Sequence, residues 1–412
     1  MAQVQRQTKL FAAEDYTAVY ESYINANLQA YDFDTIRESM VTYIRENYPE
    51  SYNDWVESAE FVSLLDVVAR FGHALAFRID INARNNFIST AERTDSVYKL
   101  ANFLGYTPRR NTTASGFVKI ISVKTNEDVI GNNGTTLSGQ EFNFENSTSA
   151  DNLDNFINIM NAIFSSTNPF GSPRKQVTVD SVTNQFYNLN NESNQIAFNF
   201  SGVAQGTQTV FNAYSSDYNT DTLRYEEKDP DPEGAFSLLY KNDGQGVLSN
   251  NTGFFFGLKE GNLDFQDFNV TDAVSGITLD VDAVNINQSD VWVQTINADG
   301  TVIKSWTKVN EVFGTNVIFN NLSNGVRDIF SVKSLFDNKI SIQFADSTFG
   351  NLPNGIIRVW YRASLNETYS LRPDDIGLKR INMTYKGADN NVYTATFTVQ
   401  LKSTINTASS AE

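Results

Sequence analysis

Residues 116–123 read Gly116-Phe117-Val118-Lys119-Ile120-Ile121-Ser122-Val123 and open a long β-rich stretch of the chain. Their aliphatic and aromatic side chains fit a pleated, half-buried strand. Similar runs recur to the end of the chain, and Asn-Gly or Asp-Gly turns separate several of them. Further predicted strands are 176–179, 196–200, 291–296, 302–309, 340–344, 356–361 and 393–400. The sequence therefore predicts a mostly β fold after about residue 110.

Residues 1–110 have a helical pattern instead. Thr35 and Glu38 have the spacing of a capping box, and Pro49 closes the helix that follows. A second helix is predicted after Ser58, and a third from 89 to 104 with Gly105 as its C-terminal signal. Apolar residues recur on the second helix at intervals that form one apolar stripe: Phe61, Leu64, Leu65, Val68, Leu75 and Ile79.

A partner interface is predicted in this helical part. Tyrosines recur at helical spacing on one face of a first helix, about 15–30, and tyrosine supplies apolar area with a polar end. Gly72 lies on the stripe of the second helix, where it permits close approach of another helix. The candidate interface residues are Tyr16, Tyr20, Tyr23, Ile24, Phe61, Leu65 and Gly72. The alternative is that the tyrosines pack on the protein's own helices.

The predicted fold class is α+β, with an N-terminal helical module followed by a β-rich multi-domain region. A chain of 412 residues exceeds the roughly 250–300 residues at which single cores stop growing. We predict an assembly module at 1–110, a β-rich domain at 111–235 with a helical insertion near 153–164, and β-rich structure at 236–412. The stretch Asp229-Pro230-Asp231-Pro232-Glu233-Gly234 cannot be regular structure and marks a loop or boundary.

Composition argues against several functional classes. The 31 basic residues face 48 acidic ones without a basic block, which argues against nucleic-acid binding. No segment approaches the roughly 20 apolar residues of a membrane span, so we predict no membrane partner. The absence of cysteine excludes disulfides and thiolate metal sites.

Catalytic chemistry has little support in the sequence. His73 is the only histidine and no cysteine nucleophile exists, so His-rich zinc sites are excluded. Paired carboxylates such as Asp229 with Asp231, or Asp264 with Asp267, suit glycosidases, but their local sequences are typical of turns and solvated strand ends. Arg109 and Arg110 are either solvated or bind a partner's carboxylates. We predict no catalytic, cofactor-binding or metal-binding residues, no cofactor, and a protein that is not an enzyme.

Several long motifs, in order along the chain, resemble a known family. They are residues 78–87, Thr90-Ala91-Glu92-Arg93-Thr94-Asp95-Ser96-Val97, 100–106, 254–261, 290–293, 340–353 and 358–362. Together they resemble the large baseplate wedge protein of contractile-tailed bacteriophages, within the baseplate J-like family. Ala345 and Ser347 stand where that family usually has glycines, which affects the local turn.

The resemblance implies a structural subunit of the tail baseplate wedge that assembles around the central hub through helical-bundle and β-domain contacts. Such a subunit would be located in the virion and assembled in the host cytoplasm. Its implied partners are a second copy of the chain, other baseplate wedge proteins, the sheath initiator and hub-proximal proteins. Family members usually continue past the position of Glu412 into a dimerisation domain, so we expect that domain to be absent here. The alternative reading is a tail adhesin or host-surface carbohydrate-binding protein, which the β-rich, Tyr- and Asn-rich middle of the chain also favours.

Overall fold

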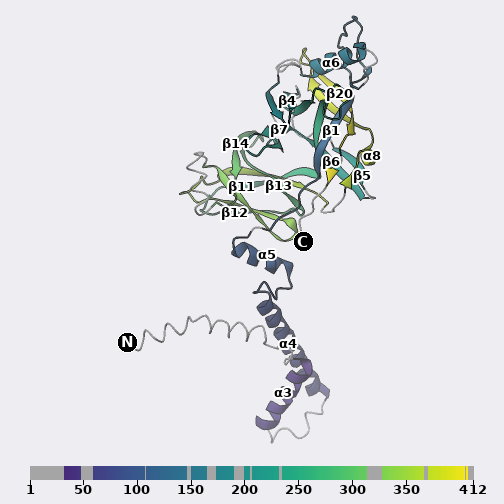
Figure 1. Ribbon diagram of the computed structural model, residues 1–412. Coiled ribbons are helices and arrows are strands. Elements are labelled where there is room, and N and C mark those ends of the chain that lie inside the picture. The colour runs from purple at the N-terminus through teal and green to yellow at the C-terminus, as the bar shows by residue number, and fades with distance from the viewer. Residues whose placement is uncertain are drawn as a thin grey trace. The chain divides into compact units, whose positions relative to one another are not determined.

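A computed structural model of the chain (Figure 1) divides into two compact units, residues 1–108 and 109–412. The structure describes residues 32–47, 59–106, 108–145, 150–164, 173–189, 199–204, 207–231, 234–312, 327–365, 370–403 and 405–406. Helices are followed by many strands, so the prediction of an α+β fold is confirmed at that level. The predicted helix at 15–30, with Tyr16, Tyr20, Tyr23 and Ile24, lies outside the described residues.

The first unit contains three described helices, α3 (Phe33–Asn47), α4 (Ala59–Arg84) and α5 (Thr94–Phe103). Asp32 caps α3, because its Oδ1 accepts the backbone N–H of Thr35 at 2.7 Å. The prediction that Thr35 caps this helix is therefore wrong, since the capping residue lies three positions earlier. The helices α3 and α4 contact each other, and Arg37 pairs with Asp66 at 2.7 Å.

The C-terminus of α5 is set by a glycine. Gly105 adopts φ +77°, and its N–H donates to the carbonyl of Asn102 at 3.1 Å. The N–H of Tyr106 donates to the carbonyl of Ala101 at 2.9 Å, which completes a Schellman motif. The predicted role of Gly105 is confirmed, while the helix begins at Thr94 and not at the predicted residue 89.

The second unit is built on two large sheets (Figure 1). One has the strand order β19-β20-β1-β10-β9-β4-β3, with β2, β5 and β6 attached to it, and the other has the order β11-β17-β13-β14-β15-β16-β12. The first sheet comprises β1 (Ser115–Thr125), β2 (Glu141–Asn143), β3 (Lys175–Val179), β4 (Val182–Asn188), β5 (Asn199–Ala204), β6 (Thr207–Tyr214), β9 (Ser237–Asn242), β10 (Gly253–Glu260), β19 (Lys379–Lys386) and β20 (Val392–Leu401). The second comprises β11 (Asn262–Val270), β12 (Thr278–Val281), β13 (Ile286–Ile296), β14 (Val302–Lys308), β15 (Ile329–Ser334), β16 (Ile340–Phe344) and β17 (Gly355–Ala363).

Smaller elements complete this unit. A hairpin is formed by β7 (Ser216–Asn219) and β8 (Arg224–Glu227), and β18 (Ser370–Leu371) pairs antiparallel with the distant β21 (Ile405–Asn406). The helices are α6 (Ala150–Phe164), η3 (Phe336–Asn338) and α8 (Pro373–Ile376). The predicted helical insertion at 153–164 corresponds to α6, and β1, β3, β13, β14, β16, β17 and β20 overlap the predicted strands. The strand predicted at 196–200 overlaps β5 at 199–200, and its residues 196–198 lie outside the described residues.

The sheets divide the chain differently from the predicted division between residues 235 and 236. The strands β9 and β10 lie in the same sheet as β1, and β19 and β20 return to that sheet after the second one is complete. The chain passes from β10 to β11 through Gly261, which adopts φ +94°. A side chain there would collide with the carbonyl oxygen of Ala363, so only glycine fits this crossing.

Each sheet has its own apolar core. The helix α6 contributes Phe156, Ile159 and Met160 to the core on one face of the first sheet. Phe186, Leu239 and Phe255 form a smaller cluster with Tyr218 of β7. The second sheet buries a separate cluster that includes Trp306.

Candidate functional site

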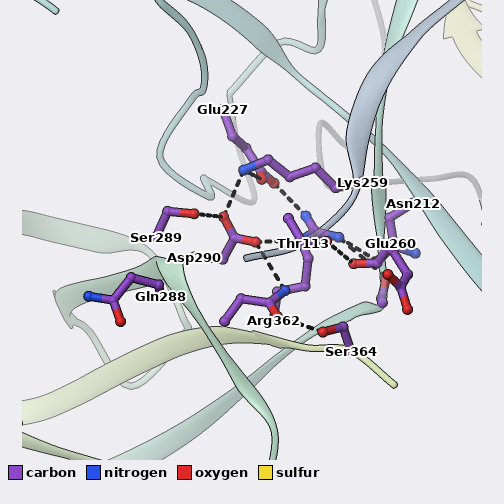
Figure 2. A network of polar contacts seen from close by, with 12 residues as sticks. Thr113, Asn212, Glu227, Lys259, Glu260, Gln288, Ser289, Asp290, Arg362 and Ser364 are labelled. Carbon is purple, nitrogen blue, oxygen red and sulfur yellow. Dashed lines mark hydrogen bonds and ion pairs between the residues drawn. The ribbon is translucent and has the colours of Figure 1, made fainter. Parts of the chain in front are cut away.

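Four charged side chains, buried or nearly so, join strands of the two large sheets and β8 (Figure 2). Lys259 of β10 lies 2.7 Å from Asp290 of β13 and 3.1 Å from Glu227 of β8. Arg362 of β17 lies 2.7 Å from Glu227 and 3.6 Å from Asp290. Two cations therefore alternate with two anions, and the formal charge of the group is zero.

Neutral polar groups surround this quartet. Arg362 Nη1 donates to Asn212 Oδ1 of β6 at 2.7 Å, and the same oxygen accepts the backbone N–H of Leu263 at 3.0 Å. Ser289 Oγ donates to Asp290 Oδ1 at 3.1 Å, and Asn287 Nδ2 donates to Asp290 Oδ2 at 3.3 Å. These additional hydrogen bonds satisfy lone pairs and protons that a bare buried ion pair would leave without partners.

The local sequence explains how charges come to lie in an apolar setting. Lys259 follows the buried run of β10, and Arg362 follows the apolar residues of β17. The pairing of β13 with β17 shifts register between Ile286 and Val291, and this irregularity contains Asp290. Bulges commonly redirect a side chain in this way.

Burial and neighbouring charges shift the pKa values of Asp290 and Lys259 in opposite directions. The side chains of Asp290 and Arg362 are 0% exposed, and that of Glu227 is 3% exposed. Burial raises the pKa of Asp290, but Lys259 and Arg362 outweigh it and hold that pKa below its usual value. Burial lowers the pKa of Lys259, but Asp290 and Glu227 outweigh it and raise that pKa.

These ionisation states limit what the network can do. Asp290 stays ionised and Lys259 stays protonated over the whole neutral range, so neither is suited to transfer a proton there. Each member also contacts oppositely charged members on a different strand. The arrangement fixes the two sheets against each other, and it fits a structural role better than a catalytic one.

A polar cleft of about 600 Å³ adjoins the network, because Glu227 also lines it. Its lining comes from β3, β7, β8, the loop after β8 and the second sheet, and includes Asp217, Glu226, Lys228, Asp229, Asp231 and Gln294. Burial, followed by the charge of Glu226, raises the pKa of Asp229. Burial also raises the pKa of Asp217, but hydrogen bonding to Lys175 and Tyr218 and the charge of Arg174 reverse the shift and lower it.

The two carboxylate pairs that were weighed as glycosidase candidates lie in different places. Asp229 and Asp231 both line the cleft. Asp267 is held by Arg358, whose Nε and Nη2 each lie 2.8 Å from its carboxylate oxygens. Asp264 and Asp267 both lie on β11, and no residue of β11 lines the cleft.

The predicted interface residues that the structure describes belong to the first unit. Leu65 is 4% exposed, Phe61 is partly buried, and Gly72 faces Ile36 of α3. A Cβ on Gly72 would lie 3.5 Å from two carbons of Ile36, so the helices approach closely there.

Sequence reasoning missed the buried network and misplaced Arg110. Arg110 is neither solvated nor available to a partner, because it is 2% exposed and donates to Ser334 Oγ at 2.8 Å. The only signal for the network was a charged residue at the end of each apolar run, at Lys259 and Arg362. That signal does not say which opposite charges meet.

Residues 116–404 match a family that is described as a domain of unknown function, DUF8360. The chain belongs to the DUF8360 family. No curated protein and no solved structure matches it. The matched range in this DUF8360 protein runs from β1 past β20, so it contains both sheets and the network between them. Among the described helices, none is long and apolar enough to cross a membrane.

Proposed function

We propose that this DUF8360 protein is a structural subunit of the tail baseplate wedge of a contractile-tailed bacteriophage. The ordered motifs that resemble the baseplate J-like family support this proposal. In this proposal the chain assembles around the central hub through helical-bundle and β-domain contacts, and the helical unit binds a second copy and other wedge proteins. The partners include the sheath initiator and hub-proximal proteins, and the protein is located in the virion.

The observation that carries the proposal is the exposed apolar surface of α4. Leu64 is 61% exposed, Val67 is 67% exposed and Phe71 is 65% exposed. An apolar stripe of this kind on a helix usually packs against another helix. Contiguous exposed apolar surface is also typical of sites that bind other proteins. A subunit that assembles through helices needs such a surface.

Electron microscopy of virions labelled with an antibody against this chain tests the location. We expect the label around the central hub of the baseplate. Label at the tips of tail fibres would instead favour an adhesin, and virions without label would refute a virion role.

A matched pair of variants tests the helical interface. Phe71→Glu places a charge on the apolar surface of α4, whereas Ser63→Glu places the same charge at a polar exposed position of the same helix. We expect Phe71→Glu to abolish co-purification with the wedge partners while the thermal unfolding of both variants stays unchanged. If both variants co-purify equally with these partners, α4 is not the interface.

A second candidate function is a tail adhesin that binds host-surface carbohydrate. The polar cleft favours it, since carboxylates and amides such as Asp231 and Gln294 are groups that hydrogen-bond sugar hydroxyls. Titration calorimetry with purified host-surface polysaccharide tests it. Binding that is lost in Asp231→Ala would support the adhesin, and the absence of heat at millimolar sugar would refute it.

A further inference from the structure

Lys241 lies on the face of the first sheet that is opposite α6. Residues two apart on a strand point to the same face, so Lys241 and Leu239 of β9 share a face. The register pairs Leu239 with Phe255 of β10, and Phe117 of β1 with Gly257. Phe255 and Gly257 are also two apart, so Lys241, Phe255 and Phe117 all project to this one face.

Three aromatic rings surround the amino group of Lys241. Its Nζ lies 4.3 Å from the ring centroid of Phe117, 4.8 Å from that of Tyr225 and 5.3 Å from that of Phe255. A cation within about 6 Å of an aromatic face is attracted by the ring quadrupole. Tyr225 of β8 is itself held in place, because its hydroxyl donates to Asn184 Oδ1 at 2.7 Å. We call these three rings the aromatic cage.

The amino group of Lys241 has no hydrogen-bond acceptor or carboxylate partner among the residues that the structure describes. Lys119, also near a ring, differs in this respect. Its Nζ donates to the carbonyls of Val247 and Ser249 at 2.7 and 2.8 Å, and pairs with Glu145 at 2.8 Å. An ordinary ammonium is strongly hydrated, and the partial burial of Lys241 removes some of that hydration without a hydrogen-bonded replacement. A methylated ammonium has fewer N–H groups to satisfy and keeps its attraction to the rings.

We propose that Lys241 is a methyl-accepting site, and that Phe117, Tyr225 and Phe255 hold the methylated ammonium. The methyl donor is a sulfonium compound. The lone pair of the neutral amine attacks the methyl carbon, and the carbon–sulfur bond breaks. The sulfur leaves with that electron pair as a thioether, and one proton leaves the nitrogen.

The electrostatic setting supports this assignment. Burial lowers the pKa of Lys241 to about 8. At pH 7 its neutral, nucleophilic fraction is therefore about two orders of magnitude larger than that of an ordinary lysine. Lys259 is the opposite case, because its carboxylate partners raise its pKa.

Reductive methylation of the folded, full-length chain with ¹³C-formaldehyde and a borane reductant tests the proposal. This probe gives the same methylated amine, since the amine and formaldehyde lose water to form an iminium to which the borane adds hydride. Peptide mass spectrometry at pH 7 measures the rate at each lysine. Lys99 is the matched solvent-exposed control, with a side chain that is 80% exposed. We expect Lys241 to be methylated faster than Lys99, and Lys259 to stay unmodified.

Carbon-13 NMR of the methylated protein then tests the cage. We expect the methyl signal of Lys241 to move upfield from that of Lys99 through the ring currents, and to lose that shift in Tyr225→Leu. Lys241 reacting more slowly than Lys99, or giving a methyl signal at the same position, would overturn the proposal.

Discussion

Lys259 and Asp290 form a 2.7 Å ion pair although they belong to different sheets. Arg362 and Glu227 extend this pair into a quartet in which every charge faces an opposite one. Loss of one member leaves the other charges buried without enough opposite charge beside them. Removing one partner of a buried ion pair in this way strongly destabilises a protein. The packing of the two sheets against each other should therefore be sensitive to single substitutions in the network.

Asp290→Asn tests this sensitivity. We expect the free energy of unfolding to fall by about 3–5 kcal/mol, because Lys259 and Arg362 keep their charges and lose an anion. Urea titration followed by tryptophan fluorescence measures the change. Asp267→Asn is the control, because the ion pair between Asp267 and Arg358 is more exposed to solvent. For this variant we expect the free energy of unfolding to fall by at most about 1 kcal/mol. Equal losses in the two variants would contradict the special role of the network.

Acid should weaken the protein through the same aspartate. The pKa of Asp290 is lower in the folded state than its usual value, so its contribution to stability is present above about pH 4. That contribution is lost as pH falls through the folded-state pKa. Urea titrations at several acidic pH values should show that the free energy of unfolding declines less steeply with falling pH in Asp290→Asn than in the wild type. Parallel curves would mean that other carboxylates dominate the acid dependence of stability.

Alanine substitution at two glycines, Gly257 and Gly72, should have opposite effects on stability. A Cβ on Gly257 would lie 2.7 Å from Ser216 Oγ and would also collide with the ring of Tyr214, so we expect a loss of about 1–3 kcal/mol. A Cβ on Gly72 would meet Ile36 at 3.5 Å, which is ordinary contact. Alanine also favours the helix by up to about 1 kcal/mol, so Gly72→Ala should stabilise the first unit. Thermal unfolding monitored by circular dichroism measures both, and destabilisation by Gly72→Ala would contradict the observed spacing.

Lys241 should make the protein more stable as pH rises. Its pKa is about 8 in the folded state, below the ordinary value of about 10.4, so the unfolded chain binds more protons between these two values. The free energy of unfolding should therefore rise with pH through this window. Lys241→Met keeps the length and apolar stem, and should be more stable at pH 7 with a smaller rise. An identical pH profile in the variant would show that Lys241 does not titrate in this range.

Local signals predicted the parts of the fold that depend on neighbours in sequence. Gly105 ends α5 because the left-handed conformation suits glycine, and that preference acts within one turn. The strand around 116–123 was found from its apolar run, since residue types and their spacing report strand formation directly. The cap of α3 was misplaced because Asp32 and Thr35 are both good capping residues only three positions apart.

Residue order by itself thus determined the switch from helices to strands near residue 110, and the position of α6, because both follow from local period and composition. Only the tertiary structure decided that β19 and β20 rejoin β1, that Arg110 is buried, and that Lys259 meets Asp290. These contacts join residues far apart in the chain, and many charged residues of each sign are available to form them. Which ones pair depends on strand register and on the crossing at Gly261, and neither leaves a local signal strong enough to read in sequence.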